Sequence, residues 1–90
     1  MIRYTKTAEI AISSLHPLDK ERTENLILRL EQYPTLVESA ALLQSSRHIR
    51  ILPISTELVL LVDTQNGIVT IHDVTTPRRL GSVDRQATAI

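Results

Sequence analysis

The chain has 90 residues, with no cysteine, tryptophan or phenylalanine and only two tyrosines and two glycines. The lack of cysteine excludes disulfides, thiolate metal ligands and cysteine nucleophiles. So few aromatic rings argue against the stacking platforms that usually grip single-stranded nucleic acid. With two glycines there is no loop to cradle a phosphate, and no P-loop or dinucleotide-binding motif occurs. The core must therefore consist of leucine, isoleucine and valine.

An excess of charge of one sign is also lacking, because ten basic and ten acidic residues give a formal net charge of zero. Strong non-specific binding to nucleic acid normally needs clustered lysine and arginine. Only a local basic cluster is available, in the second half of the chain. The three histidines do not have a metal-binding spacing, and no HExxH motif occurs. We therefore expect neither a metal nor another cofactor.

The sequence contains no long apolar run and no leader. The first six residues lack the apolar core of a signal peptide, and no segment approaches the roughly 18 apolar residues that span a bilayer. We expect a cytoplasmic protein without a membrane contact. The length suits one domain. We place that domain at residues 1–83 and a flexible tail at 84–90, because the chain turns polar and small from Gly81.

Two helices are predicted in the first half, after a short strand at residues 2–4. Thr7 is expected to cap the first helix, whose apolar residues recur at helical spacing. The second helix is predicted over 18–33, because Pro17 suits a first helical turn and Pro34 ends the pattern. The apolar stripes are Ala8, Ala11, Ile12 and Leu15 on the first helix, and Leu26, Ile27, Leu30 and Tyr33 on the second.

Three strands are predicted in the second half, at residues 47–52, 57–63 and 68–74. Residues 35–46 are predicted as a linker that forms either a short helical turn or a loop. Asn66-Gly67 is a strong hairpin signal between the last two strands. The order β-α-α-β-β-β predicts an α+β fold, a small and mainly antiparallel sheet packed against two helices.

The middle strand of the three is apolar at successive positions, Leu-Val-Leu-Leu-Val at 58–62. An antiparallel sheet with one wet face should instead alternate apolar and polar residues. We therefore expect the second face of the sheet to be covered as well. The tail, a second copy of the chain in a homodimer, or a partner protein are the three alternatives.

The segment from Arg47 to Ile51 alternates basic and branched apolar residues. Residues two apart share a face of a strand, so His48 and Arg50 are predicted on one face and Ile49 and Ile51 on the other. With the isoleucines packed on the helices, the basic row would face outward. Such a row is a plausible platform for a phosphate backbone, and its alternative is an ordinary solvated strand face.

Taken in order, these segments resemble the RelE/ParE superfamily, the toxins of bacterial toxin–antitoxin pairs. The likeness covers roughly residues 1–83. Its pieces are IRYTKTA at 2–8, a second helix ending in LxxYP at 30–34, HIRI at 48–51 before an apolar strand and a hairpin, and DV at 73–74 before the basic pair 78–79.

The resemblance implies a toxin that either cleaves messenger RNA on the ribosome, inhibiting translation, or poisons DNA gyrase, and that an antitoxin protein holds inactive. In the ribonuclease members, catalysis uses basic side chains and no metal. Carried over to this chain, the resemblance implies His48 as the proton-transfer group. It implies Arg50, Arg78 and Arg79 as the groups that stabilise charge on the phosphate.

The sequence departs from the family pattern at three positions. Glu57 stands where the family pattern has an arginine. Pro77 stands where the pattern has a second arginine, and Arg78 follows one residue later. Val83 lies near the position of a family tyrosine. The alternative functions are therefore a non-catalytic module that binds protein through the same sheet, and the gyrase-poison branch.

The remaining charged residues have alternatives of their own. Glu57 would form a cross-strand ion pair with Arg50. His72 alternates with Ile71 along the last predicted strand and is expected to be packed or solvated rather than catalytic. Arg78 and Arg79 would clamp either a phosphate or an acidic antitoxin segment.

Overall fold

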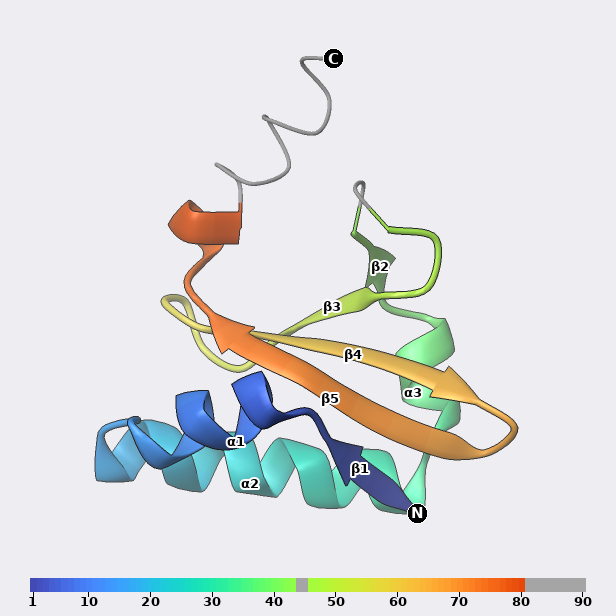
Figure 1. Cartoon of the computed structure of the whole chain (residues 1–90), viewed down its shortest axis with the longest axis horizontal. Helices are drawn as coiled ribbons and strands as arrows, with labels where there is room; N and C mark the ends of the chain where they lie inside the picture. The colour runs from blue at the N-terminus through green and yellow to red at the C-terminus, as the bar shows by residue number, and fades with distance from the viewer. Residues whose placement is uncertain (44–45, 81–90) are drawn as a thin grey trace.

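In the computed structural model, which describes residues 1–43 and 46–80, a five-stranded sheet lies over helices on one side (Figure 1). The strand order is β1-β5-β4-β3-β2, with β1 parallel to β5 and the other neighbours antiparallel. This confirms the predicted α+β fold. The elements are β1 (Ile2–Tyr4), α1 (Lys6–Ser13), α2 (Pro17–Gln32), α3 (Thr35–Glu38), β2 (Ala41–Leu42), β3 (Arg50–Pro53), β4 (Val59–Gln65) and β5 (Ile68–Thr75).

Helix α1 begins two residues earlier than the sequence predicted. The hydroxyl of Thr5 accepts a hydrogen bond from the amide of Ala8 at 3.1 Å, so Thr5 is the N-cap, and the assignment of that role to Thr7 was wrong. Thr5 has the extended backbone that a cap requires, because its own amide still pairs with Ile71 of β5. Thr7 is an exposed residue inside the first turn.

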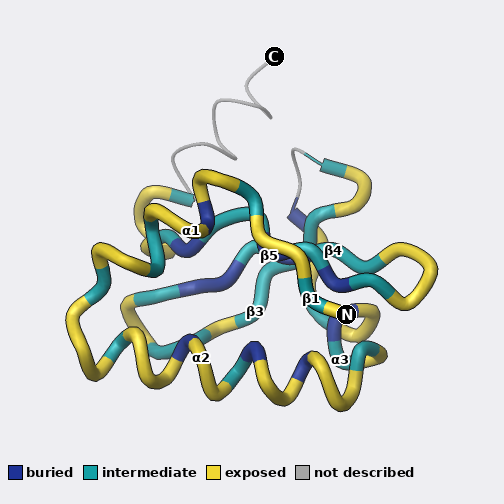
Figure 2. Tube along the Cα trace, turned by 60° about the horizontal axis from the view of Figure 1, so that its bottom comes forward, coloured by how far each residue is buried: buried dark blue, intermediate teal, exposed yellow. Residues whose placement is uncertain are grey.

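Helix α2 confirms the role of Pro17 in the first turn and most of the predicted stripe. Ile27 and Leu30 are buried, and Figure 2 shows buried positions recurring along this helix. The placement of Tyr33 in the stripe was wrong, because its side chain is 61% exposed. The helix ends at Gln32, and the non-helical backbone of Tyr33 turns that side chain away from the core.

The predicted linker contains both a helical turn and a strand. In α3, Val37 is fully buried against the core, which explains why an apolar residue stands in this connection. Strand β2 then pairs with β3 at one edge of the sheet, with Ala41 opposite Ile51 and Leu42 opposite Arg50. Two residues are too few to give a strand signal in the sequence.

Strand β3 begins at Arg50 rather than at residue 47. The hydroxyl of Ser46 accepts hydrogen bonds from the backbone amides of His48 and Ile49, both at 3.2 Å. These two amides are therefore not available to pair with a neighbouring strand. The next hairpin follows the prediction, because Asn66 and Gly67 both have positive φ, 53° and 78°, as a two-residue turn of this kind requires.

The central strand β4 divides its apolar residues between the two faces of the sheet. Leu60 and Val62 point to the helices and are fully buried with Ile71 of β5. Val59 and Leu61 lie on the opposite face. Of the predicted covers for that face, the tail falls within residues 81–90, outside the described residues, as does the domain boundary at 83. None of the described helices is long and apolar enough to cross a membrane.

Replacement of Leu60 by alanine is expected to destabilise the fold by about 2–5 kcal/mol, because this fully buried side chain would leave a cavity in the centre of the sheet. Chemical denaturation followed by circular dichroism measures the change. The matched control is Leu28→Ala, since Leu28 is 58% exposed on α2 and should alter the free energy of unfolding by no more than about 0.5 kcal/mol. Equal effects of the two substitutions would contradict the buried position of Leu60 and the exposed position of Leu28.

Candidate functional site

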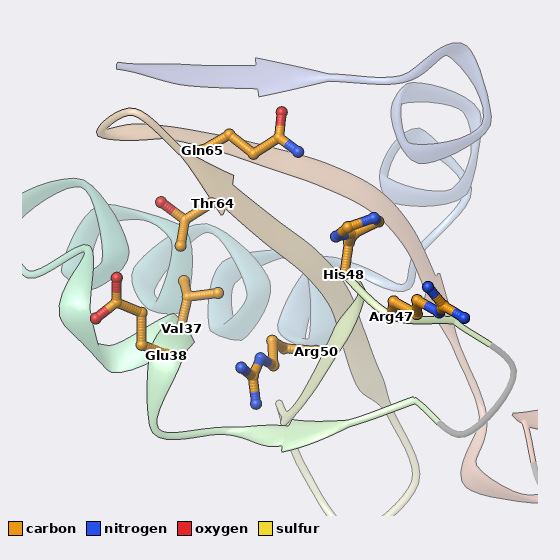
Figure 3. A pocket seen from close by; sticks show the side chains of 7 residues that line it. All are labelled: Val37, Glu38, Arg47, His48, Arg50, Thr64 and Gln65. Carbon is orange, nitrogen blue, oxygen red and sulfur yellow. The ribbon is translucent and has the colours of Figure 1, made fainter.

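A pocket of about 380 Å³ lies where α3, the end of β4 and the start of β3 meet (Figure 3). It gathers three of the basic side chains of the sequence in one place. Its lining contains two guanidinium groups, one imidazole and one carboxylate. The lining residues are Val37, Glu38, Arg47, His48, Arg50, Thr64 and Gln65.

Arg50 lies on the side of the sheet opposite to the predicted one. Its cross-strand partner is Val62, which is fully buried beneath the helices, whereas Ile51 is opposite Leu61 on the other face. Cross-strand partners share a face, so the expected outward basic row is inverted. Arg50 is accommodated because its Nη1 donates to the carbonyl of Ala40 at 3.1 Å. Figure 3 shows the guanidinium turned toward this connection.

Arg47 and His48 reach the pocket from the bend before β3, not from the strand. Both are exposed, and the turn at Ser46 determines where they lie. The prediction of one basic row on a strand face was therefore wrong, although His48 and Arg50 both line this pocket. The cationic balance of the lining suits an anion such as a phosphate.

Arg78 and Arg79 lie elsewhere, in a helical turn at 77–80 that follows β5. Thr76 begins that turn, because its hydroxyl accepts the amide of Arg79 at 3.1 Å and its carbonyl accepts the amide of Leu80 at 3.0 Å. Both arginines are exposed, and neither lines the pocket. Strand β5, which precedes them, ends at Thr75 beside Val59 and Pro53. Pro53 is three residues, or about 10 Å, from Arg50 along β3.

Glu57 is exposed in the bend between β3 and β4, where its amide donates to the hydroxyl of Ser55 at 3.2 Å. The alternative in which Glu57 pairs with Arg50 across the sheet was wrong, because the register puts Val62 opposite Arg50. Among residues 1–43 and 46–80, Arg22 forms an ion pair with Asp19, and the imidazole of His72 contacts the carboxyl group of Asp63. Within the same residues, no group of three or more side chains suits a metal ion.

His72 is the residue whose surroundings the sequence did not reveal. Its Nε2 lies 2.9 Å from Oδ2 of Asp63, and both side chains are partly buried. The two residues are nine positions apart, on different strands, and no motif joins them. The one indication in the sequence was that His72 and Asp63 lie on the two strands of the predicted hairpin.

Tyr4 marks a second hollow region, between β1 and the helices. It lines two cavities of about 250 and 280 Å³ with Glu24 and Ile27 of α2. Burial raises the pKa of Tyr4, and the negative charges of Glu31 and Glu24 raise it further. Carboxylates around a phenol favour its neutral form, so this region repels anions rather than attracting them.

No model of a known protein family matches the sequence. No curated protein matches it significantly either. Solved structures nevertheless share its fold. The intact E. coli RelBE toxin–antitoxin complex contains a chain similar to this one with a TM-score of 0.70 and 13% identity, over 84% of this chain and 94% of that chain.

Two further structures give the same result. The isolated E. coli RelE toxin has a TM-score of 0.70 and 13% identity, over 96% of this chain and 97% of that chain. YafQ from E. coli strain BL21(DE3) has a TM-score of 0.70 and 14% identity, over 89% and 96%. The chain therefore has the RelE-like fold that its sequence segments predicted.

Titration of Tyr4 tests the electrostatics of the second hollow. In a Tyr33→Phe background, where Tyr4 is the one remaining tyrosine, absorbance near 295 nm should give a pKa above the ordinary value of about 10. Folding then favours the protonated phenol, so this contribution to stability is complete below about pH 10 and is lost as the pH rises through the folded-state pKa.

Glu31→Gln should lower that pKa only part of the way, because burial is the larger cause. Glu21→Gln is the matched control, since Glu21 lies on the same helix and does not contribute to the shift. A Tyr4 titration at or below the ordinary value would contradict the described environment.

Proposed function

We propose that this chain is the toxin of a toxin–antitoxin pair, a protein that arrests growth until a partner antitoxin binds it. The observation that supports this most is the extent of the structural likeness to RelE. It spans 96% of this chain and 97% of the other, with a TM-score of 0.70. One of the similar structures is itself a toxin–antitoxin complex.

We further propose that the arrest results from metal-independent cleavage of messenger RNA on the ribosome. The pocket at Arg47, His48 and Arg50 supplies cations and an imidazole, the kinds of group that bind a phosphodiester and transfer a proton. In this proposal Arg50, Arg78 and Arg79 stabilise the phosphate. The assignment of proton transfer to His48 stays a prediction.

A second candidate is a non-catalytic module that acts by binding protein. Two observations favour it: Arg50 donates to a backbone carbonyl, and Arg78 and Arg79 lie outside the pocket. A third feature also suits a protein contact. Ile51 and Leu61 are cross-strand partners on the face opposite the helices, and both are partly exposed. Inhibition of DNA gyrase belongs to this class, since it requires no cleavage of RNA.

Inducible expression of the chain alone in a bacterial host is expected to stop growth within a few generations. Co-expression of the protein encoded by the adjacent gene, the antitoxin candidate, should restore growth by occupying the toxin. Leu60→Ala is the control, because the destabilised fold should weaken the arrest. Normal growth in cells that contain soluble, folded protein would contradict the toxin role.

Simultaneous replacement of Arg50 and Arg78 by alanine is expected to abolish arrest and to reduce messenger cleavage by about 100-fold, because stabilisation of the phosphate would be lost. Cleavage is measured by primer extension on a defined messenger in a reconstituted translation system. Arg29→Ala removes an exposed arginine of α2 and should have no effect. If the double variant still arrests growth, these arginines are not the phosphate ligands.

A further inference from the structure

The face of the sheet opposite the helices carries a histidine–aspartate pair that the proposed site does not use. Nε2 of His72 and Oδ2 of Asp63 lie 2.9 Å apart, with 29% and 17% of the two side chains exposed. The pair is thus open to solvent on one side and supported by the sheet on the other. Such a pair is the usual way to orient a histidine for proton transfer.

A bulge in β5 places His72 on this face. Leu61 of β4 is opposite Asp73, and the next residue, Val62, is opposite Ile71, so His72 is the extra residue of the ladder. His72 and Asp73 are both partly exposed, between buried neighbours on either side. The hydroxyl of Thr5 donates to the carbonyl of His72 at 2.8 Å and holds the bulged backbone in place. Bulges commonly redirect side chains in this way beside active sites.

The hydrogen bond determines which ring nitrogen is available. Asp63 as a carboxylate only accepts, so Nε2 of His72 carries the proton of this bond. In the neutral imidazole, Nδ1 then holds a lone pair. Within the described part of the chain, Nδ1 makes no hydrogen bond. His72 is therefore oriented as a base toward a ligand on this face.

A cation lies on the same face. Arg3 of β1 is in register with Thr70 of β5, and Thr70 with Asp63 of β4, so the three residues form one row across the sheet. The row is two strand spacings wide, about 10 Å between its outer Cα atoms, which an arginine side chain largely spans. Arg3 is exposed, and it forms no ion pair with any residue of 1–43 or 46–80.

Two carboxylates on this face oppose an anion, Asp63 and Asp73, and Asp63 is bonded to His72. Asp73 lies beside His72 and would repel a phosphate. Its Oδ1 accepts the amide of Val74 at 2.8 Å, which holds that carboxylate against its own backbone. The charged groups around His72 on this face are therefore Asp63, which orients it, Asp73, and Arg3, which supplies the positive charge.

We propose that His72, positioned by Asp63 and assisted by Arg3, is the general base of an RNA-cleaving site on the face of the sheet opposite the helices. The inference rests on the proposed role of the chain as an RNA-cleaving toxin, and it replaces the pocket at His48 and Arg50 by the other face of the sheet as the place of the reaction. Nδ1 of His72 takes the proton of a ribose 2′-hydroxyl, and the 2′-oxygen attacks the adjacent phosphorus. The bond from phosphorus to the 5′-oxygen breaks, and that oxygen takes a proton from solvent. The imidazolium returns its proton to solvent, leaving a 2′,3′-cyclic phosphate and a 5′-hydroxyl.

Three variants test this assignment on a defined messenger RNA, both free and in a reconstituted translation system, with chelator present in the free assay. His72→Gln retains a donor for Asp63 but no base, and should lower cleavage at least 100-fold while thermal unfolding shows an intact fold. His72→Ala should lose cleavage equally and regain part of it on addition of imidazole, which a purely structural role would not allow. Asp63→Asn should lower kcat with KM little changed.

The matched controls are histidine and arginine substitutions away from this face. His16→Ala, at the exposed N-cap of α2, should leave cleavage unchanged. Arg3→Lys should retain more cleavage than Arg3→Ala, because only the second removes the charge. Cleavage that persists in His72→Gln, or that is lost in His48→Ala alone, overturns the assignment.

The outcomes separate this inference from the proposed function. If the wild-type chain arrests growth but cleaves neither form of the messenger, the toxin role stands and the cleavage site is overturned. If it neither arrests growth nor cleaves RNA, both are overturned. Attack by the 2′-hydroxyl must pass through a 2′,3′-cyclic phosphate. If the products carry a 3′-phosphate and no cyclic phosphate forms on the way, the 2′-hydroxyl is not the nucleophile and His72 is not its base.

Discussion

The register of β4 against its two neighbours is the constraint on which the rest of this structure depends. Leu60 and Val62 are fully buried beneath the helices, and Ile71 of β5 packs beside them. A slip by one residue would turn these side chains to the opposite face, so the hydrophobic core fixes the register strongly. Arg50 on β3 and Asp73 on β5 then have their faces determined by apolar partners, Val62 and Leu61, rather than by their own chemistry.

That register determines where two side chains that could contact a ligand lie, Arg50 and His72. Opposite Val62, Arg50 is brought to the helix side, where a pocket beside α3 receives it. At the bulge that follows in β5, His72 is brought to the other side, against Asp63. The basic residues at 46–80 are thus divided between two faces of the sheet and the turn at 77–80. A single irregularity in the ladder separates the two candidate locations for proton transfer.

The sequence predicted those elements whose signals are local. Pro17 at the start of α2 and Asn66-Gly67 at the hairpin each act through their own backbone. The signals that failed depended on partners. Thr5 rather than Thr7 caps α1 because β1 holds Thr5 in an extended conformation, and the side chain of Ser46 delays the start of β3. The face of Arg50 and the pairing of His72 required the register and the bulge, and neither is encoded by alternation within one strand.

The charge distribution bears on how such a protein would meet RNA. The net charge is zero, and the lysines and arginines of residues 1–43 and 46–80 are spread over the pocket, the turn at 77–80, Arg3 and the helices α1 and α2. This part of the chain therefore lacks the clustered basic surface that gives strong non-specific binding. It also has few aromatic rings for stacking on bases. Local groups of this kind can act on a phosphodiester only if the strand is held in place by something else. A messenger already fixed in the ribosome, the RNA target proposed for this chain, meets that requirement.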